Sequence, residues 1–142
     1  MKLEKKLIGQ IKSIVSSAQE RAVRSINTER VQMYWQIGKL IFEEEQQGKE
    51  RSEYGAFLIK SISKELKPLF GSAFSARQLY RYVPFYKAFP MVSALRTQFS
   101  WTHYRTLLPI ENEDKRTFYI AEAEKNNWSA RQLESKNLKP NT

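Results

Sequence analysis

The pentapeptide Ser-Ala-Arg-Gln-Leu occurs twice in this chain of 142 residues, at 75–79 and again at 129–133. Each copy directly follows an aromatic residue, Phe74 in the first case and Trp128 in the second. Serine is a favoured helix N-cap, and a glutamine three residues later can accept a hydrogen bond from the backbone N–H of the cap, which closes a capping box. The leucine then lies one position further, where it can pack on the aromatic as a hydrophobic staple. We therefore predict that a helix begins at the serine of each copy.

A related start, Phe99-Ser100-Trp101-Thr102-His103, lacks the glutamine. His103 is the only histidine of the sequence, so it cannot form a metal cluster with other histidines. We expect it to bond to the backbone or to pack near the start of its helix. The arginine of each pentapeptide, Arg77 or Arg131, is the second residue of its helix and points away from the stapled face.

The basic residues are unevenly distributed along the chain. The formal net charge is +9. Residues 66–110 contain no aspartate or glutamate, and they include ten aromatic residues. Their basic residues are Lys67, Arg77, Arg81, Lys87, Arg96 and Arg105. Basic residues that cluster in this way are typical of proteins that bind polyanions, with nucleic acid as the leading interpretation. The alternative is an ordinary solvated basic face.

Residues 2–26 carry apolar side chains at spacings of three and four. These are Leu3, Leu7, Ile11, Ile14, Ala18, Ala22 and Ile26. The pattern predicts one long amphipathic helix whose apolar seam is close to a heptad. Because such a helix has more apolar face than a small domain can cover, we expect it to act as an oligomerisation arm that pairs with another copy. A membrane-surface helix is the alternative, but its apolar face lacks aromatic side chains.

The remaining residues, 27–142, are predicted to form one helical domain. Further helices are expected over 28–47, with Thr28 as its cap, and over 53–69, 76–89, 100–108 and 111–126. Gly38 inside the second helix predicts a close backbone approach, and Gly48 is expected to end that helix. The short turn from Gly71 to Ser75, between the third and fourth helices, is typical of a helix-turn-helix arrangement. The fold class is therefore all-α and winged-helix-like, with a short extended wing in residues 91–99.

The fourth helix is predicted to have two different faces. Its core face holds Leu79, Tyr82, Val83, Tyr86 and Phe89, whereas Arg77, Tyr80, Arg81 and Lys87 lie broadly opposite. A basic face that includes an aromatic residue suits insertion into a DNA groove or contact with phosphates. Pro84 is expected to kink or end the helix, since it cannot donate to the Tyr80 carbonyl.

The sequence contains no sign of a complete active site. It has no cysteine, no Gly-rich phosphate-binding loop and no HExxH motif, so we expect neither a metal nor a cofactor. Three Glu-x-Lys fragments, at 65–67, 113–115 and 134–136, are predicted to lie on helix surfaces, where they would not form a nuclease centre. The chain has no apolar run of spanning length and no signal-peptide core. We expect a soluble, cytoplasmic protein that is not an enzyme by itself.

Six blocks of the sequence, in order, resemble one known domain. They are Tyr34-Trp35-Gln36-Ile37-Gly38, Arg51-Ser52-Glu53-Tyr54-Gly55, Phe70-Gly71-Ser72-Ala73-Phe74-Ser75, Phe85-Tyr86, Ser100-Trp101-Thr102-His103-Tyr104 and Asn127-Trp128-Ser129-Ala130-Arg131-Gln132-Leu133. Over about residues 20–136 the chain is similar to the N-terminal domain, of unknown function, of the bacterial YhcG-like family of predicted PD-(D/E)XK nucleases. The resemblance implies a mostly helical, winged-helix-like DNA-binding module. It also implies a nuclease domain that normally follows on the C-terminal side and is absent from these residues.

Together these observations favour a module that places a basic recognition helix, about 75–89, on duplex DNA and delivers an attached or associated nuclease. DNA is favoured over RNA as the partner. The candidate nucleic-acid contacts are Arg77, Tyr80, Arg81, Lys87, Arg96, Arg105 and Arg131. The alternative is a protein-interaction or oligomerisation module that makes no direct contact with nucleic acid.

Overall fold

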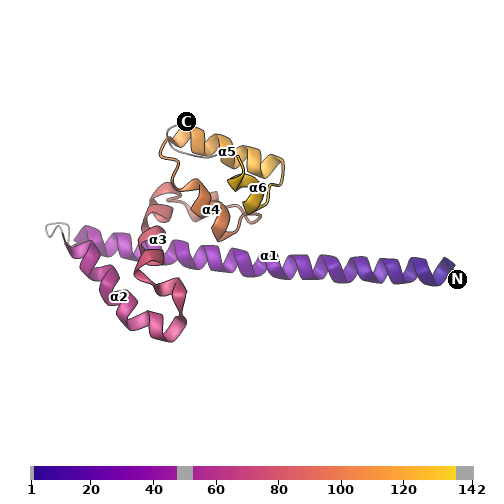
Figure 1. The fold of residues 1–142 in the computed structure, drawn as a ribbon, viewed down its shortest axis with the longest axis horizontal. Helices are drawn as coiled ribbons and strands as arrows, with labels where there is room; N and C mark the ends of the chain where they lie inside the picture. The colour runs from indigo at the N-terminus through magenta and orange to yellow at the C-terminus, as the bar shows by residue number, and fades with distance from the viewer. Residues whose placement is uncertain (1, 48–52, 137–142) are drawn as a thin grey trace.

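A computed structural model describes residues 2–47 and 53–136 of the chain. Its elements in order are α1 (Lys2–Gln47), α2 (Tyr54–Phe70), the 3₁₀ helix η1 (Ser72–Phe74), α3 (Ala76–Ala88), the 3₁₀ helix η2 (Val92–Ala94), α4 (Trp101–Leu107), α5 (Glu113–Lys125) and α6 (Ala130–Glu134) (Figure 1). The described residues contain no strand. The predicted all-α class is therefore confirmed. The stop expected at Gly48 lies outside the described residues.

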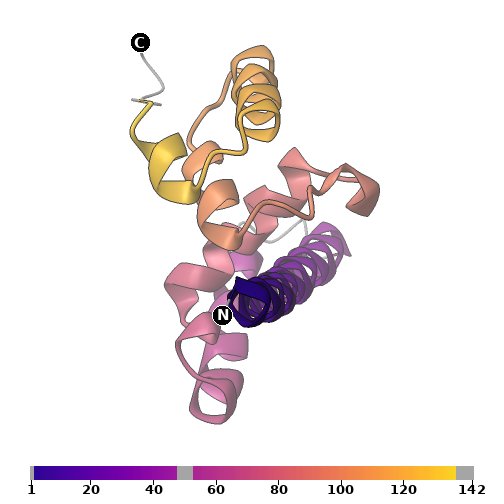
Figure 2. The same ribbon diagram turned by 90° about the vertical axis from the view of Figure 1, so that its right-hand side faces the viewer.

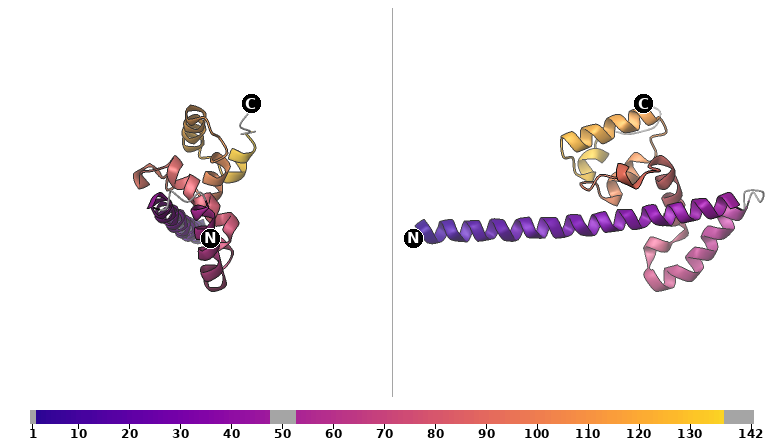
Figure 3. Two further views of the ribbon diagram at one scale, coloured as in Figure 1. Left: turned by 90° about the vertical axis from the view of Figure 1, so that its left-hand side faces the viewer. Right: turned by 180° about the vertical axis from the view of Figure 1, so that it is seen from behind.

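Helix α1 is continuous through position 28, so the predicted break and the capping role of Thr28 are wrong. No glycine or proline interrupts the chain there, and a threonine without such a breaker is compatible with a helix interior. Its hydroxyl instead donates to the Thr97 carbonyl oxygen at 3.5 Å. The N-terminal part of α1 projects beyond the other helices (Figures 1 and 3). No helix of the described residues is long and apolar enough to cross a membrane.

The second half of α1 packs across α3. Val31, Tyr34, Trp35 and Ile41 are buried on one face of α1, and the indole Nε1 of Trp35 donates to the Phe89 carbonyl oxygen at 2.6 Å. The close approach predicted at Gly38 is confirmed, because a Cβ built there would lie 2.6 Å from the backbone carbonyl carbon of Tyr82. Position 38 therefore fixes where the two helices cross.

Aromatic side chains fill the space between α1, α3 and α4. The rings of Tyr34 and Tyr82 stack with centroids 4.5 Å apart, and Trp101 of α4 meets both rings edge-on. Phe85 of α3 contacts Tyr104 at 4.9 Å between centroids. The expected core side of α3 is confirmed, with Phe85 added to it. Because interlocked rings resist sliding, this packing holds α3 and α4 in one fixed relation.

The connection from α2 to α3 follows the predicted turn. Gly71 has φ +92°, a conformation that glycine adopts without strain, and η1 supplies the next three residues. The Tyr82 hydroxyl donates to the Ala73 carbonyl oxygen at 2.7 Å, which ties the turn to the middle of α3. Helix α3 continues through Pro84 to Ala88, so this proline does not end it.

Residues 91–99 do not form the expected extended wing. They contain the 3₁₀ helix η2 and turns, with the Ala94 amide bonded to the Met91 carbonyl oxygen at 2.9 Å. The loop that follows is held from α4, because the Arg96 backbone N–H donates to the Tyr104 hydroxyl oxygen at 2.6 Å. A turn closed by its own backbone bonds leaves few groups free for pairing as a strand.

Both pentapeptides begin helices at their serines, as predicted. The Ser129 hydroxyl accepts from the Gln132 amide at 3.1 Å, and the Ser129 amide donates to Gln132 Oε1 at 2.9 Å, so the second copy forms a complete capping box. The first copy forms only half of one, with the Ser75 hydroxyl accepting from the Gln78 amide at 3.2 Å. Leu79 and Leu133 are fully buried.

Candidate nucleic-acid interface

The outward side of α3 carries most of the predicted contact residues. Arg77 and Lys87 are exposed, Tyr80 is 50% exposed, and Arg81 is half-buried. Arg77 and Arg81 are four residues apart, so they lie one above the other on the same face of the helix. The structure therefore confirms that α3 has a buried core face and an opposite face that carries the basic residues.

A groove runs between α3 and the end of α4 beside these residues. It is open to solvent, has a volume of about 290 Å³, and is lined by Tyr80, Arg81, Pro84, Arg105, Leu108 and Pro109. Arg105 comes from α4, which the aromatic core holds against α3. The groove thus joins two predicted arginines that are far apart in sequence with an exposed tyrosine. We call Tyr80, Arg81 and Arg105, together with Arg77 one turn before Arg81 on α3, the basic groove residues.

The arginines of this cluster repel one another. The pKa of Arg81 is lowered from its ordinary value by partial burial and then by the positive charges of Arg105 and Arg77. The acid-free segment 66–110 supplies no carboxylate to offset them, and the ion pairs of the described residues include none to Arg77, Arg81 or Arg105. A guanidinium stays charged at any physiological pH, so the arrangement favours an anion in the groove.

Gln78 positions Arg81 at the edge of this cluster. Arg81 Nη1 donates to Gln78 Oε1 at 3.3 Å, one turn back on the same helix. In the second pentapeptide the equivalent side chain, Gln132, bonds to the cap instead. The two identical pentapeptides therefore use their glutamines differently, and only the one beside the groove orients an arginine.

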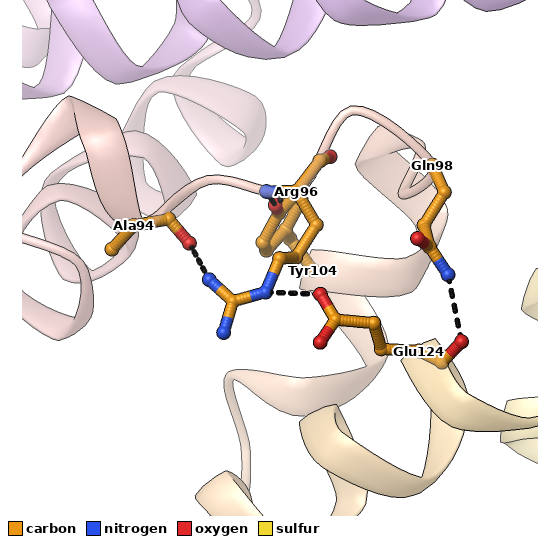
Figure 4. Close-up of polar contacts among 5 residues, drawn as sticks. All are labelled: Ala94, Arg96, Gln98, Tyr104 and Glu124. Carbon is orange, nitrogen blue, oxygen red and sulfur yellow. Dashed lines mark hydrogen bonds and ion pairs between the residues drawn. The ribbon is translucent and has the colours of Figure 1, made fainter.

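Arg96 occupies a different environment from the basic groove. Its Nε lies 2.6 Å from Glu124 Oε2 of α5, and its Nη1 donates to the Ala94 carbonyl oxygen at 2.5 Å (Figure 4). Gln98 adds a bond from its Nε2 to the Glu124 carbonyl oxygen at 3.1 Å. These contacts fasten the 95–99 loop to α5. The sequence predicted Arg96 as a nucleic-acid contact, and its carboxylate partner, 28 residues further along the chain, could not be predicted from the sequence.

Two other predicted contacts also lie outside the groove lining. The Lys87 ammonium lies 5.6 Å from the ring centroid of Phe42 on α1. Arg131 is exposed on α6, near its start. The structure therefore brings together four of the seven candidates and leaves three at separate places.

His103 has the structural role expected from its position. Its Nδ1 accepts a hydrogen bond from the Ser100 backbone N–H at 3.0 Å, so its Nε2–H donates to the Trp128 carbonyl oxygen at 2.8 Å. The ring also stacks on Phe99, with centroids 4.9 Å apart. These bonds join the start of α4 to the segment before α6. The described residues contain no group of three metal-ligating side chains.

The order and character of these elements can be compared with known proteins. The family described as the DUF1016 N-terminal domain matches residues 10–139. The chain belongs to this family. The DUF1016 N-terminal domain described here is also 33% identical over 153 residues to a protein of Escherichia coli (strain K12) named "Putative nuclease YhcG". The resemblance to the YhcG-like family noted from the six blocks is thus confirmed.

The alignment covers 85% of the present chain but only 41% of that Escherichia coli protein. The DUF1016 N-terminal domain therefore accounts for less than half of the length of this relative. No solved structure matches the chain.

Proposed function

We propose that this DUF1016 N-terminal domain is a DNA-binding module that delivers a PD-(D/E)XK-type nuclease domain to duplex DNA. The observation that carries the proposal is the basic groove, where Arg81 and Arg105 line one hollow and Arg77 lies one turn before Arg81 on α3, without a carboxylate among the described ion pairs of these arginines. Phosphate oxygens are the common anionic partner for arginines arranged in this way, because a guanidinium can bond to them in bidentate geometry. The nuclease named in the Escherichia coli relative supports a nucleic acid as the source of those phosphates.

In this proposal α2, η1 and α3 act as a helix-turn-helix unit with α3 as the recognition helix. Arg77 and Arg81 project from its first two turns, the part of a recognition helix that normally reaches base edges and flanking phosphates. Arg105 contacts the backbone from α4, and the exposed ring of Tyr80 packs against sugar or base. Lys87 and Arg131 are placed as outer phosphate contacts. Arg96 contributes only if it leaves Glu124.

The domain itself performs no chemistry in this proposal. The three Glu-x-Lys fragments lie on or beside α2, α5 and α6, as expected, and most of their charged side chains are exposed. A PD-(D/E)XK centre needs its carboxylates and lysine to converge around a metal ion. The proposed role is therefore to bind and position, while cleavage belongs to the nuclease domain.

Fluorescence anisotropy with labelled duplex and single-stranded DNA tests the proposal. If about three to five phosphates are neutralised, the logarithm of the association constant should fall with the logarithm of salt concentration with a slope of about −2.7 to −4.5 for a duplex. Duplex should bind more tightly than single strands at every salt concentration. Absence of binding at low salt, or binding that does not depend on salt, would refute the phosphate assignment.

A further inference from the structure

We propose that the groove between α3 and α4 holds one unpaired base of a DNA duplex, so that the domain prefers duplexes with an unpaired nucleotide over fully paired ones. This inference rests on the proposed function, because it assumes that the arginines of the groove bind DNA phosphates. It goes beyond that function in naming the form of DNA that fits. The groove combines apolar walls, backbone acceptors and basic side chains in one small hollow.

The walls of the groove are mainly apolar, although its rim is basic. Four of its six lining residues are Tyr80 and Pro84 of α3, and Leu108 and Pro109 at the end of α4. Tyr80 is 50% exposed, and both prolines are exposed as well. A phosphate backbone lying across the groove would contact the arginines and leave these apolar surfaces without a partner. The face of a base would cover them, because proteins commonly bind unpaired bases by stacking them on aromatic side chains.

The groove has room for one ring system rather than for a longer segment. Its volume of about 290 Å³ is close to the lower limit of the about 300–1,000 Å³ that small-molecule pockets span. All six lining residues belong to α3, to α4 and to the turn after α4, and α4 lies next to α3 in the view along α1 (Figure 2). Because the aromatic core fixes these two helices against each other, the groove is formed in the protein without DNA.

Both prolines also leave a carbonyl oxygen beside the groove without its usual helical donor. Pro84 follows Tyr80 by four residues, and Pro109 follows Arg105 by four. Proline has no N–H, so neither one can donate to the carbonyl four residues before it. A carbonyl oxygen accepts hydrogen bonds and therefore needs a donor, which a phosphate oxygen is not. The amino groups on the edges of bases are donors of this kind.

The basic side chains supply the phosphate contacts that flank such a base. Arg81 and Arg105 line the groove from two helices, and Arg77 lies one turn before Arg81. The pKa of Arg81 is lowered by partial burial and then by the charges of Arg105 and Arg77, and a bound anion relieves that repulsion. An unpaired nucleotide presents a base and its phosphates together, so it offers a partner to each part of the groove.

The same contacts favour a base that is unpaired before it binds. Taking a base out of a paired stack costs free energy, whereas an unpaired base is already accessible. A fully paired duplex can therefore use the arginines but must be distorted before it can fill the groove. A duplex that contains one unpaired nucleotide uses both.

Fluorescence anisotropy with three labelled duplexes of one sequence tests the inference. The first is fully paired, the second carries a single unpaired adenine at its centre, and the third carries an abasic nucleotide at that unpaired position. The parent should bind the duplex with the unpaired adenine about 5- to 150-fold more tightly than the paired duplex, which is the range that stacking of one base supports. The abasic duplex should bind like the paired one, because it has the extra nucleotide but no base.

Variants of Tyr80 test whether the groove is the place where the base binds. Tyr80→Ala should bind the paired duplex and the duplex with the unpaired adenine equally, whereas Tyr80→Phe should keep the preference because it keeps the ring. The matched control is Phe118→Ala, which removes a ring that is also 50% exposed but belongs to α5, outside the groove lining. This control should keep the preference. Circular dichroism checks that every variant is folded.

The possible outcomes separate this inference from the proposed function. Equal binding of all three duplexes by the parent, with a steep salt dependence, would overturn the inference and leave the proposed function supported. A preference that the abasic duplex shares, or that Tyr80→Ala retains, would also overturn it, since a bend or another surface would then be recognised. Absence of salt-dependent binding to every duplex would refute the proposed function and the inference with it.

Discussion

Gly38 of α1 and Tyr82 of α3 meet so closely that any side chain at position 38 would overlap the Tyr82 backbone carbonyl. Tyr82 is also the residue whose hydroxyl holds the turn before α3 and whose ring stacks on Tyr34. The crossing of α1 and α3 thus depends on one missing Cβ. Because α3 carries the basic groove, this contact determines where the groove lies relative to the long helix.

Gly38→Ala should destabilise the protein although alanine is the better helix former. The added Cβ forces the two backbones apart, which costs about 1–3 kcal/mol and exceeds the roughly 1 kcal/mol gained in helix propensity. Gly9→Ala is the matched control, because nothing lies within 4 Å of its added Cβ, and it should stabilise by about 0.5–1 kcal/mol. Thermal unfolding of both variants shows whether each one is less stable or more stable than the parent. Equal stabilisation by both would mean that α1 and α3 do not cross at Gly38.

The two pentapeptides should respond differently when their glutamines are changed. Ser75→Ala and Ser129→Ala should each cost about 0.5–2 kcal/mol, since both serines cap a helix. Gln132→Ala should lower the stability of the fold and leave DNA binding unchanged, because that side chain closes the capping box. Gln78→Ala should instead release Arg81 and weaken DNA binding. Chemical denaturation together with a DNA-binding assay separates the two effects, and loss of DNA binding in the Gln132 variant alone would reverse the assignment.

His103→Ala should destabilise by about 1–3 kcal/mol, since it leaves the Ser100 N–H and the Trp128 carbonyl without their partner. His103→Gln should recover part of the loss, because glutamine at this helix position can accept the same bond from the cap. Urea unfolding midpoints of the two variants provide the comparison. An alanine variant as stable as the parent would show that the bonds of His103 contribute little.

Tyr104 should make the fold sensitive to alkaline pH. Burial is the main cause that raises its pKa to about 12 from an ordinary value of 10. The unfolded chain therefore loses this proton first, so stability is retained below about pH 10 and falls as the pH rises toward 12. Burial also raises the pKa of Tyr82, which acts in the same direction. Tyr104→Phe should flatten this part of the stability profile while losing the bond to the Arg96 amide.

Local sequence signals predicted most of the element boundaries. The serine caps, the turn at Gly71 and the close contact at Gly38 each depend on the chemistry of a few neighbouring residues, which a sequence displays directly. The break at Thr28 was wrong because a potential cap does not end a helix that nothing else interrupts. The prediction of an extended wing was wrong because residues 91–95 form turns that are closed by hydrogen bonds within their own backbone.

The candidate site was only partly predictable, for a different reason. The two faces of α3 follow from helical periodicity, so Arg77, Tyr80 and Arg81 could be grouped from the sequence. That Arg105 joins them depends on how α4 packs on the aromatic core. The pairing of Arg96 with Glu124 likewise depends on tertiary packing between distant segments. Charge composition identifies a basic segment. Only the fold shows which of its arginines form an ion pair with a carboxylate, as Arg96 does, and which do not.

We propose that the three arginines of the basic groove residues, Arg77, Arg81 and Arg105, bind DNA phosphates. The most direct test compares the salt dependence of duplex binding for the parent with that of the variant Arg77→Ala, Arg81→Ala, Arg105→Ala. Its control is Lys60→Ala, Lys64→Ala, Lys67→Ala, which removes the same charge from exposed positions on α2. The arginine variant should bind more weakly, with a log–log salt slope smaller in magnitude by about 2–3, whereas the lysine variant should keep most of the slope. Equal affinity of the parent and the arginine variant at every salt concentration would contradict the account.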